Sequence, residues 1–400
     1  MDIVIIADYL GPLDGTYNSR FLYLGDILAK NHNVEIVTSN FNHGEKCFFS
    51  NNNIEKHDFK ITMINESGYK KNICLKRFWS DFIWGKGVKK YLQSRKKPDV
   101  VYAAIPPLTG VYSIINYCKS NGVRLVVDIQ DLWPNAFKMV FDYPPVSDII
   151  YYPLYRIENK IINCADSICA VSDTYVDYAK QINPELSEYE SVYLGTDLSC
   201  FDENVKRHVK DVAEKYVCTK DTDEIWLAYC GSLSDSYDLK TVIDAIAYIR
   251  NKKIKFVVMG DGYMADDFRK YSQRKSVNCI FTGMLPYAEM CALLSSCDIA
   301  VNPIKGKSAA SIINKHGDYA ASGLPVINTQ QSEEYIKLIC SYNMGVTVDV
   351  GDSFKLAEHL KELIDKKELR QTMGSNARRC AEEKFNRSKT YVLLEKLIVK

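Results

Sequence analysis

The sequence predicts an α/β protein in which two Rossmann-like halves face a central cleft. Its 400 residues exceed what one compact core usually holds, which predicts two domains. Short runs rich in Val and Ile alternate with amphipathic stretches of helical length, as in parallel sheets covered by helices. This alternation occurs twice along the chain, so each half is expected to carry a parallel sheet of its own.

The first-half strands are expected at residues 3–7, 34–38, 100–104, 124–129 and 167–171, and the second-half strands at 225–230, 255–259, 278–282, 298–303 and 325–328. The charged, weakly periodic segment 198–224 is predicted to link the halves. The expected domains are therefore residues 1–197 and 198–385. Residues 386–400 are expected to form a C-terminal helix that crosses back to the first domain.

Composition excludes several classes of protein. With 51 basic and 50 acidic residues the formal charge is +1, which gives no whole-chain reason to expect a nucleic-acid partner. The 13 cysteines are scattered without a Cys-x-x-Cys pair, which argues against zinc sites and disulfide frameworks. A reducing, cytoplasmic setting fits this cysteine usage best.

Three segments invite a membrane or targeting interpretation. Residues 1–6 predict a first strand rather than a signal peptide, because no positive leader precedes the short β-branched run. Prolines interrupt the uncharged stretch 100–118, so a strand, a loop and a helix are expected there instead of a membrane span. Residues 76–91 mix aromatic rings with cations. That pattern fits either an interfacial membrane patch or a helix that packs its rings internally, and we prefer internal packing.

Ligands of open parallel sheets bind at the carboxyl ends of the strands. After the first strand, Gly15 lies in a loop that enters a helix with Leu22, Leu24 and Leu28 on its apolar side. A glycine there would let backbone approach a ligand, although an ordinary strand-to-helix turn remains an equal alternative. The spacing is not Gly-x-Gly-x-x-Gly, which disfavours a dinucleotide-binding dehydrogenase.

Glycine turns also follow three strands of the second half. Gly231 and Ser232 precede a helix whose free amides could hold phosphate, while Asp238 could equally be that helix's N-cap. Gly260 and Met284 belong to the next two turns, where a flat base could lie against backbone.

The most informative segment is residues 311–327. A short helix ending at Gly323 would place Lys315 and Asp318 on neighbouring turns of one face. A lysine suits a diphosphate, and a carboxylate can accept both hydroxyl hydrogens of a ribose. The alternative is a surface ion pair worth only about 0.3–0.5 kcal/mol.

Several segments, taken together and in order, resemble the retaining GT-B glycosyltransferases of family 4, particularly the bacterial surface-polysaccharide branch. The resemblance covers nearly the whole chain. It rests on DIQDLWP at 128–134, ADSICAVS at 165–172, LGTDLSCF at 194–201, GSL at 231–233 and the segment 315–327.

The resemblance implies a GT-B fold and transfer of a hexosyl or N-acetylhexosaminyl unit from a nucleotide diphosphate sugar, with UDP as the default. The anomeric configuration would be retained, no metal or other cofactor would be needed, and no nucleic acid would take part. The acceptor would be a glycan or polyprenyl-linked sugar in capsular or exopolysaccharide synthesis. The protein would then be cytoplasmic, with peripheral contact on the inner face of the membrane as a further expectation.

The resemblance also places roles on residues. Asp318 matches the second acid of the family's paired-glutamate motif, while Ala310 stands in place of the first acid. Lys315 would stabilise the leaving diphosphate. Asp131 would orient the acceptor hydroxyl or act as base, or else cap the turn that follows it. The donor would also contact a backbone cradle formed by Ser311, Ile312, Ile313 and Asn314. The acceptor would contact residues of the first half: Thr16, Asn18, Arg20, Gln130 and Trp133. Gln130 stands where many members have a histidine, and Trp133 suits packing better than stacking on a sugar.

Two other functions remain open from the sequence. A sugar-nucleotide epimerase of the same fold would convert its nucleotide sugar without any acceptor. A non-catalytic binding subunit would keep the donor cleft without turnover, which the Ala310 and Gln130 departures allow.

Overall fold

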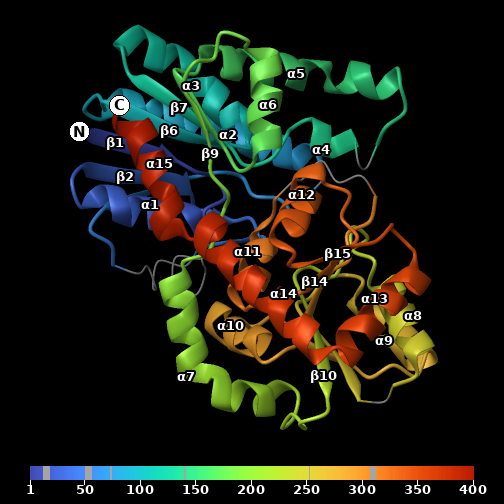
Figure 1. Cartoon of the computed structure of the whole chain (residues 1–400). Helices are drawn as coiled ribbons and strands as arrows, with labels where there is room; N and C mark the ends of the chain where they lie inside the picture. The colour runs from blue at the N-terminus through green and yellow to red at the C-terminus, as the bar shows by residue number, and fades with distance from the viewer. Residues whose placement is uncertain (12–18, 50–55, 73, 139–140, 252, 307–311) are drawn as a thin grey trace. The chain divides into compact units, whose positions relative to one another are not determined.

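The computed structural model describes residues 1–11, 19–49, 56–72, 74–138, 141–251, 253–306 and 312–400, and forms two compact units (Figure 1). The first unit comprises Met1–Tyr193 together with Thr390–Lys400, and the second comprises Leu194–Lys389. The first unit therefore ends at Tyr193 instead of at residue 197. It also contains the last residues of the chain.

A seven-stranded sheet forms the centre of the first unit, in the order β5-β2-β1-β6-β7-β8-β9 with all neighbours parallel. Its strands are β1 (Asp2–Ile6), β2 (Asn33–Ser39), β5 (Lys60–Ile64), β6 (Val100–Ile105), β7 (Arg124–Ile129), β8 (Ser167–Ala170) and β9 (Tyr189–Ser191), beside a short hairpin of β3 (Phe41–Asn42) and β4 (Cys47–Phe48). The five predicted strands are confirmed. The sequence missed β5 and β9, because these edge strands are only partly buried and lack a continuous apolar run.

Helices cover both faces of this sheet: α1 (Arg20–Ala29), α2 (Leu75–Ser94), α3 (Leu108–Asn121), α4 (Asn135–Lys138), α5 (Val146–Cys164) and α6 (Asp173–Ile182). Leu22, Leu24 and Leu28 of α1 are buried, as predicted, in one core with Tyr391 and Leu394 near the end of the chain. The uncharged stretch 100–118 forms β6 and α3, which confirms the strand, loop and helix expected there.

The second unit is built on a six-stranded sheet in the order β12-β11-β10-β13-β14-β15, again parallel throughout. Its strands are β10 (Ile225–Cys230), β11 (Ile254–Met259), β12 (Cys279–Gly283), β13 (Ile299–Asn302), β14 (Val326–Asn328) and β15 (Gly345–Thr347). Five of these match the prediction to within one or two residues. The short edge strand β15 was missed.

The helices of this unit are α7 (Leu198–Tyr216), α8 (Leu239–Ile249), α9 (Ala265–Arg274), α10 (Tyr287–Ser295), α11 (Asn314–Ala321), α12 (Glu333–Tyr342), α13 (Ser353–Asp365) and α14 (Lys367–Cys380), followed by a π-helical turn (Ala381–Phe385). The last helix, α15 (Arg387–Val399), begins in this unit and lies mostly in the first one. The predicted linker at 198–224 was wrong, because most of it is α7. That helix packs on α10 and buries Leu198, Phe201 and Val212. Among the described helices, none combines the length and apolar character needed to cross a bilayer.

Candidate functional site

Two glycine turns, at Gly231 and Gly260, pack against each other at the carboxyl ends of β10 and β11 in the second unit. A Cβ on Gly260 would lie 1.9 Å from the carbonyl oxygen of Gly231, and one on Gly231 would lie 2.6 Å from the Lys315 ammonium. Both glycines also adopt positive φ angles, +137° at Gly231 and +148° at Gly260. Only glycine fits at these positions, so the Lys315 ammonium lies directly against the backbone at Gly231.

Lys315 lies in an aromatic enclosure. Its Nζ is 4.0 Å from the ring centroid of Tyr237 and 4.5 Å from that of Tyr229, whose hydroxyl accepts a hydrogen bond of 3.4 Å. Burial lowers the pKa of Lys315 to about 8. Among the described residues, no carboxylate forms an ion pair with this ammonium. A buried cation held only by rings and a hydroxyl is suited to an anionic ligand.

Contacts made by His316 and Tyr319 hold α11, the helix that carries Lys315, in place. The imidazole of His316 stacks on the ring of Tyr335 with centroids 3.5 Å apart, and burial lowers its pKa so that it stays neutral. The backbone amide of Cys230 donates to the Tyr319 hydroxyl at 3.0 Å. These contacts anchor α11 to the end of β10, which holds Lys315 beside the Gly231 turn.

Asp318 lies one turn further along α11 and is 9% exposed. Its Oδ1 accepts hydrogen bonds from Thr196 Oγ1 at 3.1 Å and from the Tyr287 hydroxyl at 2.9 Å. Burial raises the pKa of Asp318 to about 6, although these two bonds favour the ionised form. The carboxylate thus ties the loop that contains Thr196 to α11. Its expected contact with a ribose stays a prediction.

The other predicted donor residues lie around this centre. Ser232 is exposed, and Met284 is 75% exposed after β12. Ile312 is buried, Ile313 is half-buried and Asn314 is exposed at the start of α11. Gly15 and Ser311 lie outside the described residues.

Asp238 caps α8, a role that the sequence allowed. Its carboxylate accepts from the Thr241 amide at 3.3 Å and from the Thr241 hydroxyl at 2.7 Å.

In the first unit, the predicted acceptor residue Arg20 is 4% exposed and paired with Asp128 at 3.1 Å. Its guanidinium also donates to the Val192 carbonyl at 3.0 Å and to the Tyr391 hydroxyl at 3.4 Å. Arg20 therefore connects α1 and β7 to the loop after β9 and the chain's end. Gln130 Nε2 donates to the same Asp128 carboxylate at 2.5 Å. Thr16 and Asn18 lie outside the described residues.

Asp131 and Trp133 follow β7. Asp131 accepts a hydrogen bond of 2.9 Å from the adjacent Leu132 amide, and burial raises its pKa. A raised pKa also makes a carboxylate a better base. Trp133 is 5% exposed, and the Arg77 guanidinium carbon lies 4.5 Å from its ring centroid. In this geometry Trp133 packs inside the unit.

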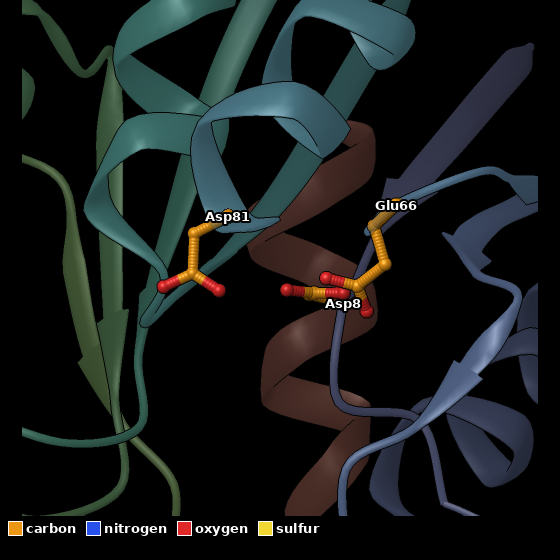
Figure 2. A group of neighbouring side chains, drawn as sticks. All are labelled: Asp8, Glu66 and Asp81. Carbon is orange, nitrogen blue, oxygen red and sulfur yellow. The ribbon is translucent and has the colours of Figure 1, made fainter. Parts of the chain in front are cut away.

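An unpredicted group of acids lies at the same end of the first sheet. Asp8 after β1, Glu66 after β5 and Asp81 on α2 turn their carboxyl groups toward one another (Figure 2), each offering an oxygen within 4.8 Å of the others. Among the described residues, these are the side chains close enough together to hold a metal ion. Glu66 accepts from the hydroxyls of Ser39 and Ser80. Neither Asp8 oxygen has a hydrogen-bond partner there.

Burial and repulsion between neighbouring acids raise the pKa values of two members of this group, Asp8 and Asp81. Burial raises the pKa of Asp8 well above its usual value, and Glu66 and Asp81 raise it further. Burial also raises the pKa of Asp81 to about 7, although nearby Arg77 acts in the opposite direction. Near neutral pH Asp8 and Asp81 therefore tend to keep protons that exposed carboxyl groups lose.

Replacing Asp81 by Asn is expected to stabilise the protein at pH 8 but not at pH 4. Because the folded pKa exceeds the unfolded one, the wild type loses stability as pH rises from about 4 through about 7. Three pKa units correspond to at most about 4 kcal/mol. Thermal unfolding of both proteins across this range measures the difference. An equal gain at all pH values would contradict the explanation, and exposed Asp148→Asn serves as the control.

No local sequence pattern indicated the aromatic enclosure around Lys315. Tyr229 lies on β10 and Tyr237 in the loop after it, and only folding brings both rings to Lys315. Thr196 lies in the quoted segment 194–201, but its contact with Asp318 spans 122 residues of chain. The Gly-Thr-Asp sequence at 195–197 indicated a turn there, but not its contact with Asp318.

Comparison with known proteins gives this geometry a context. Residues 214–380 match the family described as Glycosyl transferases group 1. HepE from Anabaena, solved in complex with UDP, aligns over 100% of both chains with a TM-score of 0.72 and 14% identity. The chain has the GT-B fold. Sucrose-phosphate synthase from Thermosynechococcus elongatus shares this GT-B architecture, with a TM-score of 0.74 and 15% identity over 99% of this chain and 97% of that one.

A relative found by sequence covers a shorter region. The Probable glycosyltransferase WbjE from Pseudomonas aeruginosa is 22% identical over 140 residues, which span 34% of this chain and 35% of that protein. The match thus covers about a third of that relative's length. The residues that match the Glycosyl transferases group 1 family all belong to the second unit, and Lys315, Asp318 and the Gly231 turn lie within the matched range.

Proposed function

We propose that this protein is a retaining glycosyltransferase. It moves a hexosyl or N-acetylhexosaminyl unit from a nucleotide diphosphate sugar to a glycan or lipid-linked acceptor in polysaccharide biosynthesis. The observation that carries the proposal is the Lys315 ammonium, buried against Gly231 without a carboxylate partner among the described residues. A diphosphate supplies the missing negative charge. The UDP complex of HepE, a protein of the same fold, supports uracil as the base.

In the proposed reaction, the bond between the anomeric carbon and the diphosphate oxygen breaks as the bond to the acceptor oxygen forms. Lys315 stabilises the charge that grows on the leaving diphosphate, where preorganised electrostatics contributes most. The departing phosphate oxygen takes the proton of the acceptor hydroxyl on the same face of the sugar. Asp131 in the first unit is the acid proposed to orient that hydroxyl. No step needs a metal ion.

The first experiment measures calorimetric binding of UDP, GDP, dTDP and NAD in the presence of EDTA. We expect one preferred nucleoside diphosphate, UDP, and no binding of NAD. Absence of all nucleoside diphosphate binding would refute the donor site. Turnover of the matching nucleotide sugar, with NMR of the product's anomeric proton, then tests transfer and retention. Epimerisation of the free nucleotide sugar without acceptor would instead identify an epimerase.

Asp318→Asn tests the proposed ribose contact separately from the diphosphate contact. If Asp318 binds the ribose diol, the variant should weaken UDP and uridine by a similar factor, about 10- to 100-fold for a hydrogen bond to a charged group. Uridine carries no phosphate, so a change in the diphosphate site would leave its affinity unaltered. Unchanged uridine binding, with normal thermal stability, would limit Asp318 to its contacts with Thr196 and Tyr287.

A further inference from the structure

The outer face of α2 is apolar and exposed. Leu75 is 88% exposed, Trp79 57% and Phe82 39%, and their spacing of four and three residues places them on one side of the helix. The Trp84 side chain of the same helix is 1% exposed and packs inward. Internal packing, preferred from the sequence for residues 76–91, is therefore correct for Trp84 and wrong for Trp79.

Positive charge continues this face. Lys86 lies one turn beyond Phe82, and its ammonium is 4.5 Å from the Phe82 ring centroid. The exposed charged side chains described between residues 67 and 90 are lysines: Lys70, Lys71, Lys76, Lys86, Lys89 and Lys90. The single acid in that stretch, Asp81, is 1% exposed. In a chain with 51 basic and 50 acidic residues, this is a strong local asymmetry.

A second exposed apolar group lies at the start of α5. Tyr143 is 71% exposed, Ile149 72% and Ile150 54%. A row of ring contacts joins the two helices through α4: the centroids of Phe78 and Phe137 are 5.6 Å apart, and those of Phe137 and Tyr151 are 6.1 Å apart. Phe78 neighbours Trp79 in sequence and Tyr151 neighbours Ile150. The beginnings of α2 and α5 therefore flank the same short helix.

We propose that this α2–α5 surface, whose apolar members are Leu75, Trp79, Phe82, Tyr143, Ile149 and Ile150, docks the first unit on a bilayer that contains anionic lipids. Exposed clusters of large apolar side chains mark interaction sites. Tryptophan, leucine and isoleucine enter the boundary between headgroups and acyl chains, while lysines attract anionic headgroups. A nucleic acid would use the lysines but leave the aliphatic side chains in water. The inference goes beyond sugar transfer and does not depend on which donor binds.

Vesicle flotation of the full chain tests the inference. We expect binding to vesicles of phosphatidylcholine and phosphatidylglycerol in a 7:3 ratio, little binding to pure phosphatidylcholine, and weakening in 0.5 M NaCl. The double variants Trp79→Ser/Phe82→Ser and Ile149→Ser/Ile150→Ser should each lower partitioning about tenfold or more. Lys76→Glu/Lys86→Glu should lower it on the anionic vesicles.

The matched control is Tyr248→Ser/Phe354→Ser in the second unit, which removes two rings of similar exposure, 60% and 66%. It should bind vesicles as the wild type does. Trp79 supplies a direct readout, since its fluorescence should shift to the blue on anionic vesicles and this shift should vanish in Trp79→Phe. The thermal unfolding midpoint of each variant checks its folding, and unchanged UDP binding separates this proposal from the donor site.

Three results would overturn the inference. One is no flotation above that seen with pure phosphatidylcholine. Another is undiminished binding by the α2 and α5 variants. The third is loss of self-association, rather than of vesicle binding, in those variants, which would make the surface an interface between copies of this chain.

Discussion

Lys315→Met is expected to weaken UDP binding about 10- to 100-fold while leaving the fold intact. Hydrogen bonds to charged groups contribute about 1.5–3 kcal/mol, and about 1.4 kcal/mol corresponds to a tenfold change in Kd. Met keeps the length of the lysine stem and its packing between the rings of Tyr229 and Tyr237. Uridine, which has no phosphate, should bind both proteins equally. Calorimetry with the two ligands measures the difference.

The same variant should abolish the pH dependence of UDP binding in the alkaline range. Burial lowers the pKa of Lys315 to about 8, so the free protein carries the ammonium below that pH and loses it above. Wild-type affinity should therefore fall as pH rises through about 8, whereas Lys315→Met should stay flat. Lys240→Met is the matched control, because the Lys240 ammonium also lies over a tyrosine ring, 5.5 Å from Tyr271, away from the glycine turns. Equal affinities of wild type and Lys315→Met at pH 7 would refute the diphosphate role.

Arg20→Met should cause a large loss of stability. Removing one partner of a buried ion pair leaves the other charge uncompensated, at a cost of about 3–5 kcal/mol. Asp128 would keep its bond from Gln130 but lose both bonds from the guanidinium, and the carbonyl of Val192 and the hydroxyl of Tyr391 would lose a donor. Thermal unfolding should show a decrease in Tm of roughly 10 °C for a unit of this size.

Two further variants test whether the loss of stability comes from the uncompensated buried charge. Arg20→Met/Asp128→Asn should recover part of the loss, since no charge is then left buried alone. Arg207→Met removes an exposed arginine from its pair with Glu203 and should change Tm little. If Arg20→Met instead unfolded like the wild type and raised only the KM for the acceptor, Arg20 would be an acceptor contact and the structural role inferred from its burial would be wrong.

Much of the fold was predictable because its signals are local. β10 and β11 are apolar runs bounded by turn residues, and the pattern of α1 repeats with the helical period. The exceptions have a common cause. The edge strands β5, β9 and β15 are partly exposed, so they lack the continuous apolar character that marks a buried parallel strand. In α7 the many charges on the outer side concealed a packed inner side.

The sequence by itself determined the two-sheet α/β architecture, the glycine turns after β10 and β11, and the placement of Lys315 and Asp318 on one short helix, because each depends on residues close together in the chain. Only the tertiary structure decided which partners these side chains have. In the folded protein Lys315 lies between Tyr229 and Tyr237, Asp318 accepts a hydrogen bond from Thr196, and Arg20 is buried against Asp128. Such contacts join residues far apart in sequence, and local sequence patterns do not indicate which distant residues folding brings together.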